Sequence, residues 1–194
     1  MWRLVAPILV VLVVLVPAVG VAASSLGSLN LRLSDFPVGF ALKSQRVWTN
    51  AESARLDNTT VANLVHHGRI LSEERLFKAR YPVNGLFEVD ASVAKYRSSA
   101  GVMWIYSRNR ALVSAFKKGG RPFRAFTAGH IGNAVSAFTD TYDMGSFRYT
   151  EDIIFFRQGS YFADMDFAGL SPSFKPGTAL HLANVLANRI RRSG

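Results

Sequence analysis

The sequence of 194 residues contains no cysteine. That absence excludes disulfides, thiolate nucleophiles, cysteine-ligated zinc, iron–sulfur clusters and the lipid-modified cysteine of bacterial lipoproteins. Histidine is also scarce, since the chain has only His66, His67, His130 and His181. Adjacent helical residues point about 100° apart, so the His66–His67 pair does not predict a chelating pair. We therefore expect no metal site.

The motifs of common catalytic sites are also missing. The sequence contains no H-E-x-x-H, no G-x-S-x-G and neither of the glycine-rich patterns that bind nucleotide phosphates. We expect no cofactor and no catalytic residue, and the chain is more consistent with a binding protein than with an enzyme. The alternative is an exported hydrolase of unfamiliar type, because Asp164 and Asp166 share one strand face and paired carboxylates can transfer protons.

Charged residues make up 19% of the chain, below the roughly 25% of an average soluble protein. They are mostly basic, and the formal net charge is +10. A surface of this kind attracts anionic lipids, acidic polymers or acidic proteins. A second alternative is therefore a basic adaptor to anionic membrane or polymer surfaces. Nucleic acid is not the expected partner, because the chain begins with an apparent export segment.

Residues 1–23 form the longest apolar stretch. Arg3 precedes 20 uncharged residues, and small residues end the stretch at Ala22 and Ala23. This pattern predicts a secretory signal peptide cleaved after Ala22 or Ala23, or an uncleaved helix that anchors the chain in a membrane. Both remain open. Residues 24–34 are interpreted as a linker, and residues 35–194 as a single globular domain.

Hydrophobic periodicity predicts the elements of that domain. We expect a strand over residues 40–47, and a helix opened by the Thr49–Glu52 capping pattern that runs to Gly68. Two strands joined at residues 82–85, a helix over residues 99–118 and further strands follow. A last helix begins near Pro176 or Thr178. The fold class is therefore α+β, an antiparallel sheet packed with about three helices and preceded by the N-terminal signal or anchor helix.

The hairpin "DIIFFRQGSYFADMDF", residues 152–167, carries apolar side chains on both faces. A two-residue turn at Gln158-Gly159 gives one ordinary core face. The other face gathers the candidate binding residues: Ile153, Phe155 and Phe162, edged by Arg157 and Asp164. Exposure of the three apolar side chains would forgo roughly 1.5–3 kcal/mol each. Either a helix, the first strand or the linker covers this face, or it binds a ligand or partner.

The segments "FPVGF", "HHGRI", "FFRQGSYFADMDF" and "ALHLANVLANRIRR" resemble those of uncharacterised exported bacterial proteins. The order of elements over residues 35–192 is similar to PsbP-like small α+β domains. The resemblance implies no catalytic residue, and the absence of a lipobox cysteine departs from the lipoprotein members.

These observations lead to one functional prediction. The chain is expected to be an extracytoplasmic, non-enzymatic binding or accessory domain, secreted or tethered to the membrane by its N-terminal segment. Its partner would be a hydrophobic ligand, a lipid or anionic envelope component, or a protein. The sequence does not set the oligomeric state.

Overall fold

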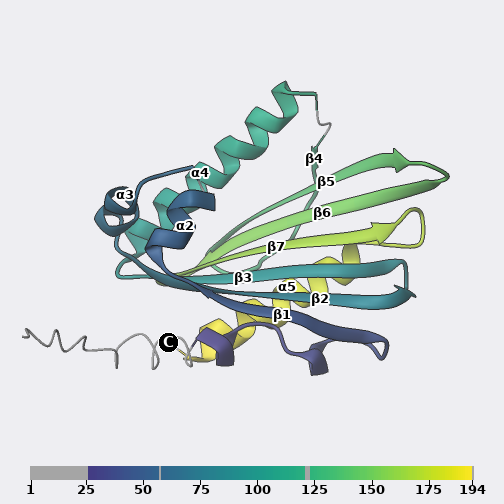
Figure 1. Ribbon diagram of the computed structural model, residues 1–194, viewed down its shortest axis with the longest axis horizontal. Helices are drawn as coiled ribbons and strands as arrows, with labels where there is room; N and C mark the ends of the chain where they lie inside the picture. The colour runs from purple at the N-terminus through teal and green to yellow at the C-terminus, as the bar shows by residue number, and fades with distance from the viewer. Residues whose placement is uncertain (1–25, 57, 121–122, 194) are drawn as a thin grey trace, which may run out of the picture.

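The computed structural model describes residues 26–56, 58–120 and 123–193 (Figure 1). Their strands form one sheet in the order β1-β2-β3-β7-β6-β5-β4, and every neighbouring pair is antiparallel. The strands are β1 (Phe40–Trp48), β2 (Arg69–Val83), β3 (Leu86–Tyr96), β4 (Arg124–Ala125), β5 (Ala134–Met144), β6 (Phe147–Gln158) and β7 (Tyr161–Leu170). The helices are α2 (Asn50–Leu56), α3 (Val61–His66), α4 (Ser99–Lys118) and α5 (Pro176–Ser193), with a 3-10 turn, η1 (Leu33–Asp35). The α+β class is confirmed, whereas the expected N-terminal helix lies outside the described residues.

Local turn chemistry sets the central hairpin. Asn84 and Gly85 connect β2 to β3, and both have positive φ, 52° and 83°. Asn-Gly is the residue pair that two-residue hairpin turns favour, because Asn and Gly tolerate this backbone region best. The strand pair expected around residues 82–85 is confirmed.

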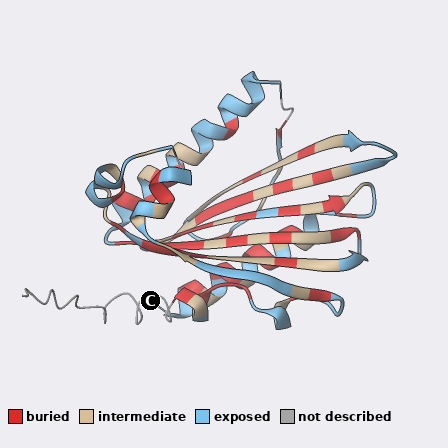
Figure 2. Cartoon of the chain, in the orientation of Figure 1, coloured by how far each residue is buried: buried red, intermediate tan, exposed pale blue. Residues whose placement is uncertain are grey.

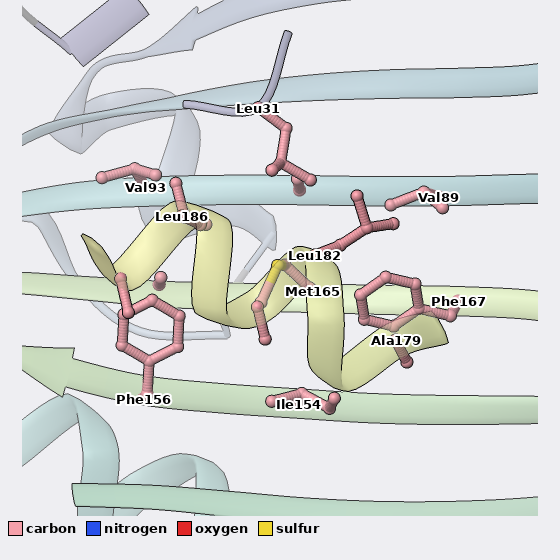
Figure 3. Packing of buried hydrophobic residues seen from close by; sticks show 14 of the residues in the cluster. Leu31, Val89, Val93, Ile154, Phe156, Met165, Phe167, Ala179, Leu182 and Leu186 are labelled. Carbon is pink, nitrogen blue, oxygen red and sulfur yellow. The ribbon is translucent and has the colours of Figure 1, made fainter. Parts of the chain in front are cut away.

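Helix α5 covers one face of the sheet. Its apolar residues recur at helical spacing and are buried along the whole helix: Ala179, Leu182, Ala183, Leu186 and Ile190. Figure 3 shows Leu182 and Leu186 lying on Met165 of β7, with Val89 and Val93 of β3 alongside. This is the main hydrophobic core, and Pro176 begins the helix at a position where its missing N–H costs nothing.

The expected linker over residues 24–34 is wrong from residue 26 onward. Leu26 and Leu31 are fully buried in the main core. Between them, the Asn30 side chain donates hydrogen bonds to the carbonyl oxygens of Glu73 (3.1 Å) and Ala91 (3.0 Å). The small polar residues of this segment predicted a linker. Among them, however, are three leucines and the Asn30 amide, which pack against the sheet.

The single helix expected from Thr49 to Gly68 is two helices. Asn58 adopts positive φ, 47°, and separates α2 from α3. Thr60 then caps α3, since its Oγ1 accepts from the backbone N–H of Asn63 at 3.1 Å. The predicted Thr49–Glu52 capping box is confirmed, with the Thr49 N–H donating to Glu52 at 2.9 Å. Asx residues break helices readily because their side chains compete with the backbone for hydrogen bonds.

Helices α2, α3 and α4 lie on the second face of the sheet (Figure 1). The start of α4 is fixed by close contact, because a Cβ added to Gly101 would lie 2.0 Å from the carbonyl oxygen of His67. From there α4 diverges from the sheet towards Lys118, and Figure 2 shows that its last turns are largely exposed. The helix and sheet therefore enclose a wedge.

Candidate functional site

The hairpin of β6 and β7 turns at Gly159-Ser160, one residue later than expected. Gln158 pairs with Tyr161, and Phe155 pairs with Asp164 instead of Phe162. The predicted register is thus wrong by two residues. Side chains alternate between faces with a period of two, so this shift leaves every residue on the face that the sequence predicted.

The second face of this hairpin is covered at its inner part by α4. Phe155 and Phe162 are only 1% and 5% exposed. The Tyr106 ring of α4 meets the Phe155 ring edge-on with centroids 5.5 Å apart, and its hydroxyl hydrogen-bonds Ser136 at 2.8 Å. The second face of the hairpin is therefore partly covered by the chain itself. Helix α4 packs on two of its three large apolar side chains, Phe155 and Phe162.

Beyond the Tyr106 contact, the wedge between α4 and the sheet opens into a cleft of about 310 Å³. Four of the five predicted residues line its floor: Ile153, Phe155, Phe162 and Asp164. Arg157 does not. It pairs with Phe162 and Ala134 near the turn, and it lies past the end of the cleft.

The upper wall of the cleft is apolar yet open to solvent. Leu112 and Phe116 of α4 line the cleft and remain 44% and 48% exposed, and Leu56 of α2 is 63% exposed. Ile105 and Val113 of α4 line the deeper part and are buried. A wall that offers half-exposed apolar side chains above an aromatic floor is typical of a binding surface.

The outer floor of the cleft is an acidic rim, of which the sequence analysis singled out only Asp164 and Asp166. Glu74, Asp164 and Asp166 line it. Asp90 of β3 lies directly opposite Asp166 of β7, and Ser92 lies opposite both Glu74 and Asp164. In β3, Glu88 and Asp90 alternate with apolar residues and so share one face. Only the strand order brings that face beside Asp164 and Asp166, which lie more than 70 residues further along the chain.

Some of these groups are held in place by neighbours. The Asn109 amide of α4 donates to Asp164 Oδ2 at 3.3 Å and so joins the α4 wall of the cleft to its floor on β7. The Trp48 indole donates to Glu74 Oε2 at 3.1 Å, which places the Trp48 ring at the rim. The walls are therefore defined by specific contacts and not by packing alone.

The carboxyl of Asp90 is partly buried beside other carboxylates. Burial raises its pKa to about 7, and the carboxylates of Glu74, Asp166 and Glu88 add to the rise. An aspartate with this pKa is partly protonated at neutral pH. Burial, with a smaller contribution from the neighbouring carboxylates, thus favours the protonated form of this side chain.

Arg69 is the only basic residue among the described residues that line the cleft. Its guanidinium donates to Asn50 Oδ1 (2.7 Å), to Ser53 Oγ (2.6 Å) and to Ser72 Oγ (2.6 Å). Those bonds hold α2 against β2. The arginine is therefore part of the inner wall of the cleft.

The adjacent histidines of α3 and its C-terminal cap pack beside Trp104 of α4. The His66 and His67 rings lie 4.9 Å apart, and His67 stacks on Trp104 with centroids 4.0 Å apart. Among the described residues, no three His, Asp or Glu side chains are arranged to hold a metal ion.

The helices of residues 26–56, 58–120 and 123–193 include none with the length and apolar character of a membrane span. The predicted signal or anchor lies outside them.

Neither protein-family models nor curated protein sequences give a match to this chain. Among solved structures, the chain is similar to the extracellular domain of PknH from Mycobacterium tuberculosis, with a TM-score of 0.56 and 8% identity. The similarity covers 88% of this chain and 96% of that one. It shows a shared fold over nearly the whole of both chains. The resemblance to PsbP-like domains stays a prediction.

Proposed function

We propose that this chain is an extracytoplasmic, non-enzymatic binding domain that takes a small, largely apolar ligand into the cleft between α4 and the sheet. The observation that carries the proposal is the cleft wall. Leu112 and Phe116 line the cleft together with Phe155 and Ile153, and they stay about half exposed although Phe116 has the Phe123 ring beside it. A ligand between the two walls would bury this apolar surface, at about 25 cal/mol for each Å².

The size of the cleft favours a small molecule over a protein. At about 310 Å³ it lies at the lower end of the roughly 300–1,000 Å³ typical of small-molecule sites. Its aromatic floor is deep in the wedge, where a flat protein surface does not reach. A lipid-like envelope component or another small hydrophobic molecule fits this shape better.

Two observations support a location outside the cytoplasm. The sequence of residues 1–23 has the pattern of an export signal or anchor. The similar solved structure is itself an extracellular domain. The absence of a recognisable catalytic motif supports a binding role, and Asp164 and Asp166 contribute to the rim of the same cleft.

The test is a binding titration on the full-length chain in lipid nanodiscs, with empty nanodiscs as the blank. The probe is 4-phenylbutan-1-ol, a neutral molecule with an aromatic ring and a short chain. Trp48 lines the cleft, so its fluorescence reports occupancy, and the Trp48→Phe variant gives the background from the other two tryptophans. We expect saturable quenching of the Trp48 signal.

The Leu112→Ala/Phe116→Ala double variant should bind the probe at least about tenfold more weakly, because each lost side chain removes apolar contact of about 1 kcal/mol or more. Met103→Ala is the matched control. Met103 is also a half-exposed apolar residue of α4, but it lies outside the cleft, beside α3. Equal binding by the double variant, or no saturable signal at all, would contradict the proposal.

A further inference from the structure

The described chain begins inside the hydrophobic core. Residues 26–29 are helical, and Leu26 is fully buried in the main core. The predicted signal or anchor ends at Ala23, only three positions earlier in the sequence. An extended chain covers at most about 11 Å over three residue steps. The folded domain therefore starts very close to the end of the apolar run.

The first described residues are fixed to the domain at several points. The Asn30 amide bonds carbonyl oxygens of β2 and β3, and the Asn30 carbonyl oxygen accepts from Arg189 of α5 at 2.6 Å. Figure 1 shows this start of the described chain (purple) beside the last turns of α5 (yellow). The end of the apolar run is thus joined to one particular surface of the domain, the one formed by residues 26–35 and the end of α5.

That surface is basic. Arg32 follows the buried leucines, and Arg191 and Arg192 lie in the last turn of α5, and all three are exposed. Arg189 lies one turn earlier and forms an ion pair with Asp35 at 2.8 Å. Asp35 offsets one of these four positive charges, so the group carries a formal charge of +3.

The exposed arginines bond neutral oxygens of their own segments. Arg32 donates to the carbonyl oxygen of Ser28 at 2.9 Å, and Arg191 donates to Asn188 Oδ1 at 2.8 Å. Leu33, next to Arg32, is 49% exposed. Arginines beside an exposed apolar side chain suit the boundary between lipid head groups and acyl chains.

We infer that residues 1–23 stay attached as a membrane anchor and that Arg32, Leu33, Arg191 and Arg192, which we call the basic junction, rest on anionic phospholipid head groups. The uncharged run before Ser24 has 20 residues. It matches the roughly 20 residues of a spanning helix and exceeds the about 7–15 apolar residues of a signal peptide.

The lengths bring the domain and the lipid together. A spanning helix that ends at Ala23 leaves Leu26 within about 11 Å of the hydrocarbon boundary. The head-group layer on each side of the hydrocarbon is about 5–8 Å thick. Guanidinium groups bind phosphate oxygens in pairs, and each base near an anionic leaflet adds to the attraction.

The basic junction is separate from the cleft. Helix α5 covers one face of the sheet, whereas α4 and the cleft lie on the other face (Figure 1). The inference therefore does not depend on the proposed ligand, and contact with lipid at the basic junction leaves the mouth of the cleft open.

The absence of cysteine lets a single introduced thiol report the placement of the domain. Ser28→Cys and Ser114→Cys are matched variants, since both serines are exposed and lie on opposite faces of the sheet. Each full-length variant is labelled with bimane in nanodiscs whose phosphatidylcholine carries a nitroxide on its head group. We expect position 28 to lose more than about half of its emission, because it lies next to the head-group layer, and position 114 to lose little.

The lipid preference is measured at the same position. Bimane at position 28 is quenched in nanodiscs that contain an equal fraction of either phosphatidylglycerol or phosphatidylcholine with a nitroxide near the top of the acyl chain. The ratio of the two quenching constants gives the enrichment of the anionic lipid. We expect about threefold enrichment at 0.05 M salt, since several arginines attract the leaflet. It should approach one at about 0.5 M salt, because ions screen exposed charges.

The charge variant replaces Arg32, Arg191 and Arg192 by glutamine and should abolish the enrichment. Its matched control removes three exposed bases of α4, on the other face of the sheet, and should keep the enrichment: Arg110→Gln, Lys117→Gln and Lys118→Gln. Thermal unfolding checks that both variants are folded.

The anchor is tested by the intact mass of the exported chain in the membrane fraction, which should include residues 1–23. A released chain that begins at Ala23 or Ser24 would overturn the inference. Equal quenching at positions 28 and 114 would overturn it as well. So would an enrichment that survives in the charge variant, or one that both charge variants lose alike, because the basic junction would then not select the lipid.

Discussion

Asp35 and Arg189 lie 154 residues apart in the sequence and form a two-point ion pair, with Nη2–Oδ1 and Nη1–Oδ2 distances of 2.8 Å and 3.0 Å. The Arg189 guanidinium also donates to the carbonyl oxygen of Asn30 at 2.6 Å. These bonds join the segment around η1 to α5. The part of the chain that follows the predicted export segment is thereby attached to the last helix of the domain.

Arg189→Ala should lower the free energy of unfolding at pH 7 by about 1–3 kcal/mol, the range for hydrogen bonds between charged groups. The Asp35 side chain is only 10% exposed and would lose its main partner. Urea unfolding measures the difference. Arg191→Ala is the control, since Arg191 is exposed and donates a hydrogen bond to Asn188 of its own helix. Equal losses in the two variants would contradict the role of the pair.

The same pair predicts a dependence on pH. Burial alone would raise the pKa of Asp35, but hydrogen bonds from Arg189 and from the Arg32 N–H outweigh it and lower the pKa below 3.8. A lowered pKa stabilises the folded state at pH values above the unfolded pKa, and this is lost as pH falls through the folded pKa. The stability difference between the parent chain and Arg189→Ala should therefore shrink below about pH 4. A constant difference from pH 7 to pH 3 would be inconsistent with this linkage.

Gly101→Ala should destabilise the chain by about 1–3 kcal/mol, the usual cost of forcing an extra methyl group into a packed contact. The added Cβ would lie 2.0 Å from the His67 carbonyl oxygen, so α4 or α3 has to move. Gly177→Ala in α5 is the matched control, because its Cβ meets nothing within 4 Å. That variant should keep or gain stability, since alanine favours helices. Thermal unfolding of both variants measures the two changes in stability.

Phe155→Ala and Phe116→Ala should behave very differently, although both phenylalanines line the cleft. Phe155 is buried against Tyr106, so its loss should cost about 3–5 kcal/mol of unfolding free energy. Phe116 is 48% exposed and touches Phe123 at a ring distance of 6.4 Å, so its loss should cost less than about 1 kcal/mol. A large loss for Phe116→Ala would mean that this side chain serves the core and not a ligand.

Asp90 should titrate near neutrality. Its raised pKa, about 7 against 3.8 unfolded, means that the folded state binds more protons between these values, so this group makes the chain less stable as pH rises from about 4 to 7. The charged groups that face it are Glu74 and Lys78 of β2, Glu88 of its own strand and Asp166 of β7. Asp90→Asn should remove this loss, and Asp166→Asn should lower the Asp90 pKa.

Carboxyl carbon NMR shifts of labelled Asp90 measure the titration directly. The Asp143→Asn variant should leave the titration in place, because Asp143 lies outside the cleft. A midpoint near 4 in the parent chain would contradict the raised pKa of Asp90.

Local signals predicted most of the elements. The Asn84-Gly85 turn, the Ser99–Lys118 helix and the apolar stripe of α5 follow from residues within one turn or one hairpin of each other. Two predictions were wrong by small amounts: a single helix across Asn58 and a turn at Gln158-Gly159. One Asx residue, or one step along a turn, changes the result while the apolar pattern stays the same.

The acidic rim could not be predicted in the same way. Asp90 and Asp166 become neighbours only because β7 inserts beside β3, and that pairing depends on the whole sheet. The buried leucines of residues 26–31 were missed for a similar reason, since their partners lie on strands more than 40 residues away. Ile153, Phe155, Phe162 and Asp164 were found early because one short hairpin carries all four.

Helix α4 is held tightly at Gly101, whereas its other end has looser contacts, with Lys117 over the Phe138 ring at 5.5 Å and Phe116 beside Phe123 at 6.4 Å, so it resembles a lever that is firmest at its inner end. Its 20 residues span about 30 Å, so a rotation of about 5° at the inner end moves the far end by about 2.6 Å. The width at the mouth is therefore far more sensitive to small tilts than the width at the back. If the proposed function is correct, ligands of different girth would fit with almost no repacking around Tyr106.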